Sequence, residues 1–325
     1  MLIKTRRAWE LPESAATPEH VYMSRREWLK AAGFTGLGLG AALVGNGLLA
    51  GSALAAIGGY PFPRNDAYQL DRAITDEEEA TTYTNFYDFG SSKNIWKKTR
   101  KMSNDPWSVT IDGLVEEEIT LDAADLVSRM GGFEERLYRH RCVEAWSMAV
   151  PWSGVPLANL MKVANPKPEA KYLRMETFMD PDVAPGQKQG WYPWPYVEGL
   201  TIEEAQNELA FLATGIYGKP LPNQNGAPIR LVTPWKYGFK AIKSIVRFTF
   251  TDQRPVSFWE QLAGNEYGFW ANVNPGIPHP RWPQRTERLL GTGQRVPTQI
   301  FNGYREQVEH LYANLGITDP RELYY

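Results

Sequence analysis

Cys142 is the only cysteine among the 325 residues, and charged residues surround it. It lies in the stretch YRHRCVEAWSM, residues 138–148, with Arg139 and Arg141 before it and Glu144 after it. Basic neighbours lower the pKa of a thiol, and the thiolate is the form that ligates metals or attacks electrophiles. Glu144 is then a candidate for handling protons or ordering water beside the sulfur. The alternative is a buried, inert cysteine with both arginines in structural ion pairs, and composition alone favours it.

The numbers and spacing of the cysteines and histidines argue against several kinds of disulfide, metal and haem site around this thiol. One cysteine allows no intrachain disulfide, no cysteine-held iron–sulfur cluster and no Cys-x-x-Cys-His site for covalent haem. The four histidines are far apart in the sequence and show no metal-ligand spacing, which argues against a zinc or copper site built by the protein. A glycine-rich dinucleotide fingerprint and a Walker A loop are also missing, so NAD and ATP are not expected.

The N-terminal residues predict export. Residues 24–30, SRREWLK, contain two adjacent arginines and precede a run rich in Gly, Ala and Leu. This order resembles a twin-arginine leader, and residues 53–55 offer a small-x-small cleavage pattern. We expect residues 1–55 to be a cleaved signal peptide and the protein to reach the periplasm by the twin-arginine route. An uncleaved anchor is the alternative, since the run is roughly long enough to span a bilayer of about 30 Å.

The export route and the amino-acid composition limit the classes to which this protein can belong. Twin-arginine export carries folded proteins, as is needed when a cofactor is inserted before transport, so the leader itself favours a bound cofactor. With 22% charged and 13% aromatic residues the chain is an ordinary globular protein. Its net charge of −2 gives no reason to expect nucleic acid as a partner. Beyond residue 60 no apolar run is long enough to cross a membrane, so we expect a soluble mature part.

The elements that must position Cys142 are short strands and scattered helices, which predict one α+β domain. Residues 56–105 are expected to form an extended N-terminal arm, and residues 106–325 the catalytic domain. Strands are expected at 107–115, 136–146, 171–177, 227–233 and 243–251. Helices are expected at 121–130, 155–164, 201–215 and 304–316, the third opened by a capping box from Thr201 to Glu204.

Several motifs in this order carry a resemblance to a known family. They are TNFYDFG, RCVEAWSMAVPWSGVPL, YVEGL, LPNQNGAPIRLVTPWKYGFKAIKSI and EYGFWANVNP. Together they resemble the catalytic subunits of the periplasmic protein-methionine-sulfoxide reductases, which are molybdopterin-dependent enzymes of the sulfite-oxidase fold. The resemblance covers essentially everything after residue 80. It implies the single mixed domain of that fold, without a C-terminal dimerisation domain, and a monomer.

The resemblance also implies a cofactor and the residues that bind it. One molybdenum–molybdopterin per chain is expected, with Cys142 of RCVEAW as the metal ligand and Glu144 as its catalytic neighbour; a soft thiolate suits such a metal. The implied cofactor contacts are Thr84, Asn85, Tyr87, Asp88, Cys142, Thr177, Asn225, Arg230, Ala241, Ile242 and Lys243. Arg230 and Lys243 are suited to the cofactor phosphate. The chain departs from the family at Thr84 and Asp88, where the family has Asn and Glu, and at Ala241, which replaces a glycine.

Aromatic residues could line the substrate cleft, since thioether and sulfoxide sulfur pack against rings. The candidates are residues 191–196 (WYPWPY), Trp146, Trp152, Trp235, Trp259 and Trp270. The alternative for most of them is an ordinary place in the core.

The implied function is a periplasmic reductase of protein-bound methionine sulfoxide that repairs oxidised envelope proteins. The chain has no haem or flavin motif, so electrons are expected from a haem-containing membrane subunit, and oxidised periplasmic proteins are the expected substrates. Two alternatives stay open. One is another molybdopterin oxygen-atom-transfer enzyme, such as a sulfite oxidase-type dehydrogenase, against which the expected lack of a dimerisation domain argues. The other is an exported binding protein without catalysis.

Overall fold

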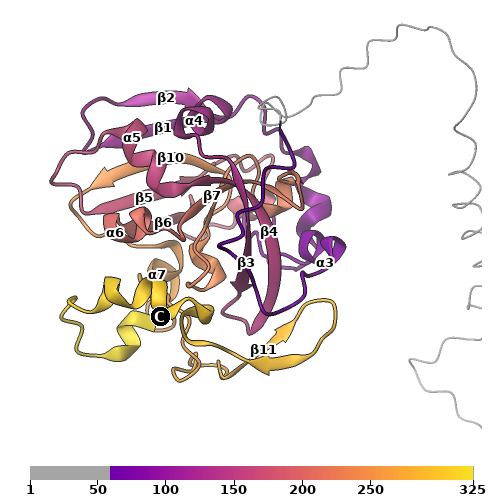
Figure 1. Cartoon of the computed structure of the whole chain (residues 1–325). Helices are drawn as coiled ribbons and strands as arrows, with labels where there is room; N and C mark the ends of the chain where they lie inside the picture. The colour runs from indigo at the N-terminus through magenta and orange to yellow at the C-terminus, as the bar shows by residue number, and fades with distance from the viewer. Residues whose placement is uncertain (1–58, 325) are drawn as a thin grey trace, which may run out of the picture. The chain divides into compact units, whose positions relative to one another are not determined.

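Two β-sheets and short peripheral helices make up the computed structural model, which describes residues 59–324 (Figure 1). The predicted leader, residues 1–55, lies outside the described residues, and its cleavage stays a prediction. All the described residues belong to one unit of the chain. None of the helices in residues 59–324 has the length and hydropathy of a membrane-spanning helix.

The first sheet has five strands in the order β2-β1-β10-β5-β6. These strands are β1 (Ser108–Gly113), β2 (Ile119–Asp122), β5 (Tyr172–Thr177), β6 (Val197–Thr201) and β10 (Ile245–Thr251). β1 and β10 are parallel, and the other neighbours are antiparallel. Alternation explains why these segments form strands: in β5, Leu173, Met175 and Thr177 are buried while the residues between them are half-buried.

The second sheet is more deeply buried. Its strands are β3 (Glu134–Arg141), β4 (Trp146–Pro156), β7 (Phe211–Ile216), β8 (Lys219–Pro220), β9 (Arg230–Val232), β11 (Thr286–Leu289) and β12 (Arg295–Pro297). The order is β12-β11-β4-β7-β8, with β3 paired to β4 and β9 paired to β7. Every residue of β7 is buried, as expected for a strand covered on both faces.

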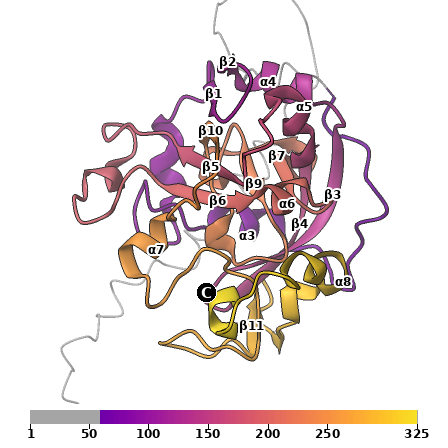
Figure 2. The ribbon, with the colours of Figure 1, turned by 90° about the vertical axis from the view of Figure 1, so that its left-hand side faces the viewer.

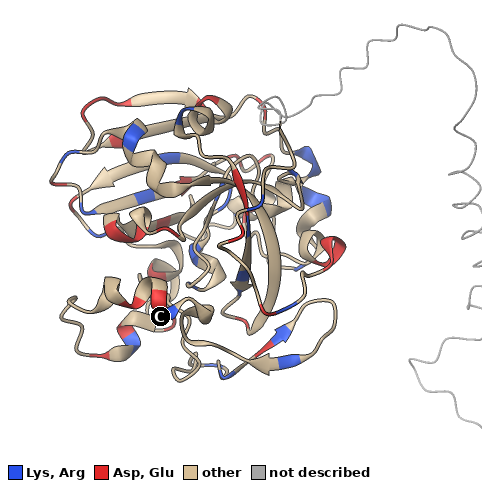
Figure 3. Ribbon diagram, in the orientation of Figure 1, with Lys and Arg blue, Asp and Glu red and all other residues tan. Residues whose placement is uncertain are grey.

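The helices are short and lie around these sheets (Figures 1 and 2). They are α3 (Glu77–Thr82), α4 (Ala123–Met130), α5 (Leu160–Ala164), α6 (Ile202–Gln206), α7 (Phe258–Ala263) and α8 (Arg305–Val308). The 3₁₀ turns η2 (Ile95–Lys101), η5 (Asn223–Asn225) and η6 (Gly238–Lys240) support the site. Acidic and basic residues are interspersed over both sheets and the helices in the view of Figure 3.

The predicted α+β class is confirmed, but several local predictions are wrong. The helix expected at 304–316 is only the short α8, followed by a 3₁₀ turn at Glu309–Tyr312. The capping box from Thr201 to Glu204 is present, yet the helix ends at Gln206 and residues 211–216 form β7. The buried ladder with β4 and β9 outweighs the local helix signal there. β4 was missed because its residues 146–156 are all apolar or small and show no alternation. The arm of residues 56–105 is not wholly extended, since it contains α3 and η2.

Candidate functional site

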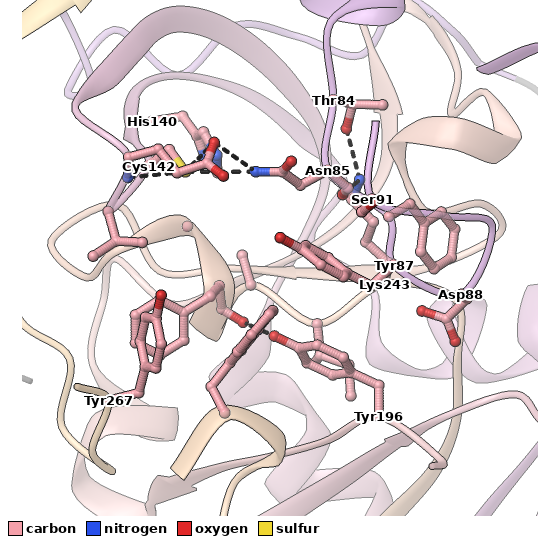
Figure 4. A pocket seen from close by; sticks show the side chains of 18 of the residues that line it. Thr84, Asn85, Tyr87, Asp88, Ser91, His140, Cys142, Tyr196, Lys243 and Tyr267 are labelled. Carbon is pink, nitrogen blue, oxygen red and sulfur yellow. Dashed lines mark hydrogen bonds between the residues drawn. The ribbon is translucent and has the colours of Figure 1, made fainter. Parts of the chain in front are cut away.

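A cavity of about 540 Å³ lies where the two sheets meet, and it is lined by every residue that the sequence predicts for the cofactor. These residues come from four separate segments: the arm after α3, the β3–β4 turn, the end of β5 and the stretch from η5 to the start of β10. Figure 4 shows Cys142 at one end of the cavity and Thr84 and Asp88 toward the other. Glu144 lines it too, so residues far apart in the sequence are brought to one place.

Cys142 is fixed by the tight turn that joins β3 to β4. Its amide donates to the carbonyl of Trp146 at 3.0 Å, and its carbonyl accepts from the amide of Ala145 at 3.0 Å. Ala145 has a φ of 64°, which closes the turn. The residue Cys142 is 5% exposed. Its sulfur faces the cavity, where the amide of Glu144 donates to it at 3.5 Å.

Burial, together with the Glu144 carboxylate, raises the pKa of the Cys142 thiol to about 12, against the hydrogen bond from the Glu144 amide. Arg141 lowers this pKa as expected, but its effect is smaller than that of burial, so the net shift of the free thiol is opposite to the expected one. Alternation along β3 places both arginines on the face opposite His140 and Cys142. A thiol that stays protonated at neutral pH is a poor free nucleophile, whereas a bound metal deprotonates its thiol ligand outright.

The two arginines are structural. The Arg139 guanidinium binds the side chains of Asp71 and Gln299. Arg141 is fully buried and pairs with Glu287 at 3.1 Å, while its Nη2 donates to Gln284 at 2.7 Å. The alternative named for both arginines, structural ion pairing, is the one observed.

Glu144 is held by three donors beside the Cys142 sulfur. Lys93 Nζ lies 2.7 Å from Oε2, Trp146 Nε1 donates to Oε2 at 3.0 Å, and Asn85 Nδ2 donates to it at 3.3 Å. Partial burial opposes ionisation, but these donors outweigh it and hold the pKa of Glu144 below its usual value. The carboxylate is therefore charged at neutral pH, with Oε2 3.8 Å from the sulfur.

The other end of the cavity holds buried positive charge. Arg230 donates to the carbonyls of Asn225 and Ala241 at 2.9 and 3.1 Å, and burial lowers its pKa to about 9. Lys243 Nζ donates to Thr84 Oγ1 at 2.8 Å, and burial lowers its pKa as well. Among residues 59–324, neither cation is in an ion pair with a carboxylate. Two buried basic side chains without an ion-pair partner suit an anionic ligand, which would favour their charged forms.

His140 is a lining residue that the sequence analysis missed. Burial, together with the charges of Arg230 and Lys243, lowers its pKa to about 3, so it stands neutral. Gly238 packs against its ring, where an added Cβ would lie 2.6 Å from Nε2. The spacing of two residues from Cys142 along a strand was the available signal, because such residues share a face.

Backbone hydrogen bonds hold the cavity-lining residues of the N-terminal arm in place. The amide of Thr84 donates to the carbonyl of Lys93 at 3.0 Å, and the amide of Gly186 donates to that of Asp88 at 2.7 Å. A Cβ at Gly186 would lie 2.1 Å from the Tyr87 carbonyl oxygen, so only glycine permits this approach. The substitution at Ala241 is tolerated, as expected, because its φ is −82°.

The aromatic prediction is confirmed in part. Trp146, Tyr192, Tyr196 and Trp259 line the cavity. Trp152, Trp235 and Trp270 are buried elsewhere, and Trp191 is 70% exposed. Tyr267, Arg281 and Trp282 line the cavity as well and were missed, although Tyr267 lies in one of the quoted motifs. The Trp282 ring stacks on His279 with 3.8 Å between centroids, and its Nε1 donates to the carbonyl of Val143 at 2.8 Å.

Asp88 gives the site a pH-dependent stability that can be measured without a ligand. Burial raises its pKa from 3.8 to about 6, against a hydrogen bond from Gln187 Nε2. A raised carboxyl pKa stabilises the fold below pH 4, and this contribution is lost as pH rises through 6. Asp88→Asn should therefore gain stability relative to the parent between pH 4 and 7, by up to roughly 3 kcal/mol. Urea unfolding of the cofactor-free proteins at pH 4 and at pH 7 measures the difference in stability between Asp88→Asn and its parent. A difference that is the same at both pH values would contradict the effect of burial on Asp88.

The donor set fits a ligand with a metal at one end and an anion at the other. One soft sulfur stands at one end and two unpaired cations at the other. Between them, the buried Oδ1 of Asn225 has no hydrogen-bond partner among the described residues and is free to accept from a ligand. No group of three or more His, Cys, Asp or Glu residues in residues 59–324 could hold a metal by protein ligands alone.

Comparison with known proteins agrees with this geometry. A family model described as the oxidoreductase molybdopterin binding domain matches residues 96–259, about half of the chain. The match includes Cys142, Thr177, Asn225, Arg230 and residues 241–243, and it begins after the arm segment of residues 84–88. Among solved structures, the chain is similar to the sulfane dehydrogenase SoxCD from Paracoccus pantotrophus, with 16% identity and a TM-score of 0.43, over 88% of this chain and 67% of that one.

Proposed function

Because this chain belongs to the oxidoreductase molybdopterin-binding domain family, and so is a molybdopterin-dependent oxidoreductase, we propose that it reduces methionine sulfoxide residues in proteins. The observation that carries the choice of substrate is the charged Glu144 carboxylate beside Cys142. Because Lys93 pairs with this carboxylate, the Glu144–Lys93 pair offers no net positive charge to attract an anion such as sulfite to the reacting position, whereas a neutral, dipolar sulfoxide needs none. Arg281 at the rim adds no free positive charge either, because it pairs with Glu266 at 2.6 Å.

The residues around the cavity divide into three tasks. Cys142 would ligate molybdenum, and Arg230 with Lys243 would face the cofactor phosphate. Thr177 acts indirectly, since its hydroxyl donates to the carbonyl of Lys243 at 2.8 Å and holds that loop. Molybdenum held by Cys142 would supply a two-electron oxygen-atom transfer, in which a sulfoxide, two electrons and two protons give a thioether and water.

The rim of the cavity suits a methionine side chain. Tyr192, Trp259, Tyr267 and Trp282 line it with ring surface, which packs well against sulfur and methyl groups. These rings also pack on one another: Trp259 and Tyr267 have centroids 5.2 Å apart. Such a preformed apolar rim binds and orients the substrate and limits the access of water to the reacting position.

Location and partners form part of the proposal. The twin-arginine pattern at residues 24–30 supports export to the periplasm, where oxidised envelope proteins would be the substrates. Because the sequence carries no haem or flavin motif, electrons would come from a separate donor, which we propose to be a haem-containing membrane subunit.

The test compares two reactions of the same holoenzyme. Turnover of a protein-bound methionine sulfoxide with a reduced dye is set against turnover of sulfite with an oxidised dye. We expect the sulfoxide to be turned over with the higher kcat/KM. Faster sulfite oxidation would overturn the choice of substrate, and failure of both reactions in molybdenum-loaded protein would overturn the proposed activity.

Arg230→Gln should weaken cofactor retention without unfolding the chain. A hydrogen bond to a charged group contributes about 1.5–3 kcal/mol, so affinity should fall about 10- to 100-fold. The test of cofactor retention measures how much pterin and molybdenum remain per chain after prolonged dialysis. The matched control is Arg305→Gln, which removes an arginine with a 64% exposed side chain paired to Glu309 and should retain cofactor like the parent. Full retention in Arg230→Gln would contradict its assignment to the phosphate.

A further inference from the structure

Lys93 reaches the Cys142 end of the cavity from outside its lining. The residue precedes η2, and its carbonyl accepts from the amide of Thr84 at 3.0 Å, which fixes its backbone. Its Nζ donates to Glu144 Oε1 at 2.8 Å and lies 2.5 Å from Asn85 Oδ1. Its side chain is only 26% exposed. One ammonium group therefore joins the two side chains nearest the sulfur.

The contact with Lys93 fixes which way the Asn85 amide points. An ammonium group only donates, so the amide must present its oxygen to Lys93. The Asn85 Nδ2 group then faces Cys142, with Nδ2 to Sγ at 3.6 Å, and also donates to Glu144 Oε2 at 3.3 Å. Figure 4 shows the Asn85 side chain directed at Cys142. Among residues 59–324, only the contact with Glu144 would oppose a flip of this amide if Lys93 were removed.

We propose that Lys93 is a positioning residue that holds the Asn85 amide as a hydrogen-bond donor to the Cys142 sulfur and so raises the reduction potential of the metal bound there. Hydrogen bonds to a ligating sulfur withdraw charge from it and favour the reduced metal. The inference rests on the assignment of Cys142 as the molybdenum ligand, which the proposed function shares. It does not depend on which substrate is reduced.

The test is a potentiometric titration of the molybdenum centre in the holoenzyme, followed by its EPR signal. Lys93→Met should bind molybdenum like the parent, with a midpoint potential shifted to a more negative value and an altered EPR spectrum. Lys93→Arg, which keeps the donors, should restore most of the potential. Lys97→Met is the matched control, because this exposed lysine lies over the Trp96 ring and contacts neither Asn85 nor Glu144. A parental potential in Lys93→Met would overturn the proposal.

A second background separates positioning from simple charge. If Lys93 acts through Asn85, Lys93→Met should shift the potential less in an Asn85→Ala protein than in the parent. Equal shifts in the two backgrounds would show that only the charge matters and would overturn the positioning role. Should Lys93→Met bind no molybdenum, Lys93→Gln replaces it, and a potential equal to that of Lys93→Arg would count against the proposal. A loaded parent that does not turn over sulfoxide would remove the proposed function and leave this titration valid.

Discussion

Lys240→Met is expected to destabilise the protein by about 3–5 kcal/mol, the cost of leaving a buried carboxylate without its partner. Lys240 in η6 pairs with Glu198 in β6 at 2.6 Å, and both side chains are fully buried. Burial raises the pKa of Glu198, and the attraction of Lys240 opposes this rise. The pair also anchors the start of the loop that carries Ala241, Ile242 and Lys243 into the cavity, so cofactor retention should fall with stability.

The pH dependence of that loss identifies its cause. Without Lys240 the pKa of Glu198 rises further, and a raised carboxyl pKa gives stability at low pH that is lost as pH rises through it. The destabilisation should therefore be larger at pH 8 than at pH 5. Adding Glu198→Gln should recover most of it, since the carboxylate that had lost its partner is then gone as well. Lys188→Met is the matched control, because its exposed pair with Asp182 should contribute less than about 1 kcal/mol. A Lys240→Met protein as stable as its parent at both pH values would contradict this account.

The fold gathers the residues of the quoted motifs around one cavity. Asn85, Cys142 and Arg230 lie on different elements, and nothing in their local sequence indicates that they meet. The family resemblance carried that information, and the cavity contains every predicted cofactor residue. Whether these residues bind the cofactor stays a prediction until it is measured.

Other features of the site depend on geometry that local sequence does not express. Lys93 was not singled out, because its role arises from a side chain that crosses to Glu144, 51 positions away. The net shift in the pKa of Cys142 is opposite to the predicted one, because the sequence does not show how deeply the thiol is buried or that Glu144 lies beside it. Alternation along β3 points Arg141 away from the cavity and His140 into it. Burial then outweighs the remaining positive charge.

Strands buried on both faces were harder to predict than half-buried ones: β3 and β9 were found, but β4 and β7 were missed. β5 and β10 were found by their alternating pattern. In contrast, β4 and β7 are buried along nearly their whole length, so apolar residues follow one another and no period of two appears. The segment of residues 211–216 read as the end of a helix for this reason.

Cys142→Ser is expected to abolish activity while leaving the fold intact. Serine fills almost the same volume in the β3–β4 turn, so the turn's backbone hydrogen bonds can persist. Its hydroxyl, however, is a hard ligand that stays protonated and replaces a soft thiolate poorly. Sulfoxide turnover should fall to the level of metal-free protein, with a melting temperature close to that of metal-free parent.

The molybdenum content of the purified protein tests the central claim most directly. Parent and Cys142→Ser proteins are produced together under conditions that load other molybdenum enzymes, and metal per chain is measured by mass spectrometry. We predict about one molybdenum per parent chain and a large loss of metal in Cys142→Ser. A parent chain without molybdenum, or a Cys142→Ser chain that keeps a full complement, would contradict the assignment of this cysteine as the metal ligand.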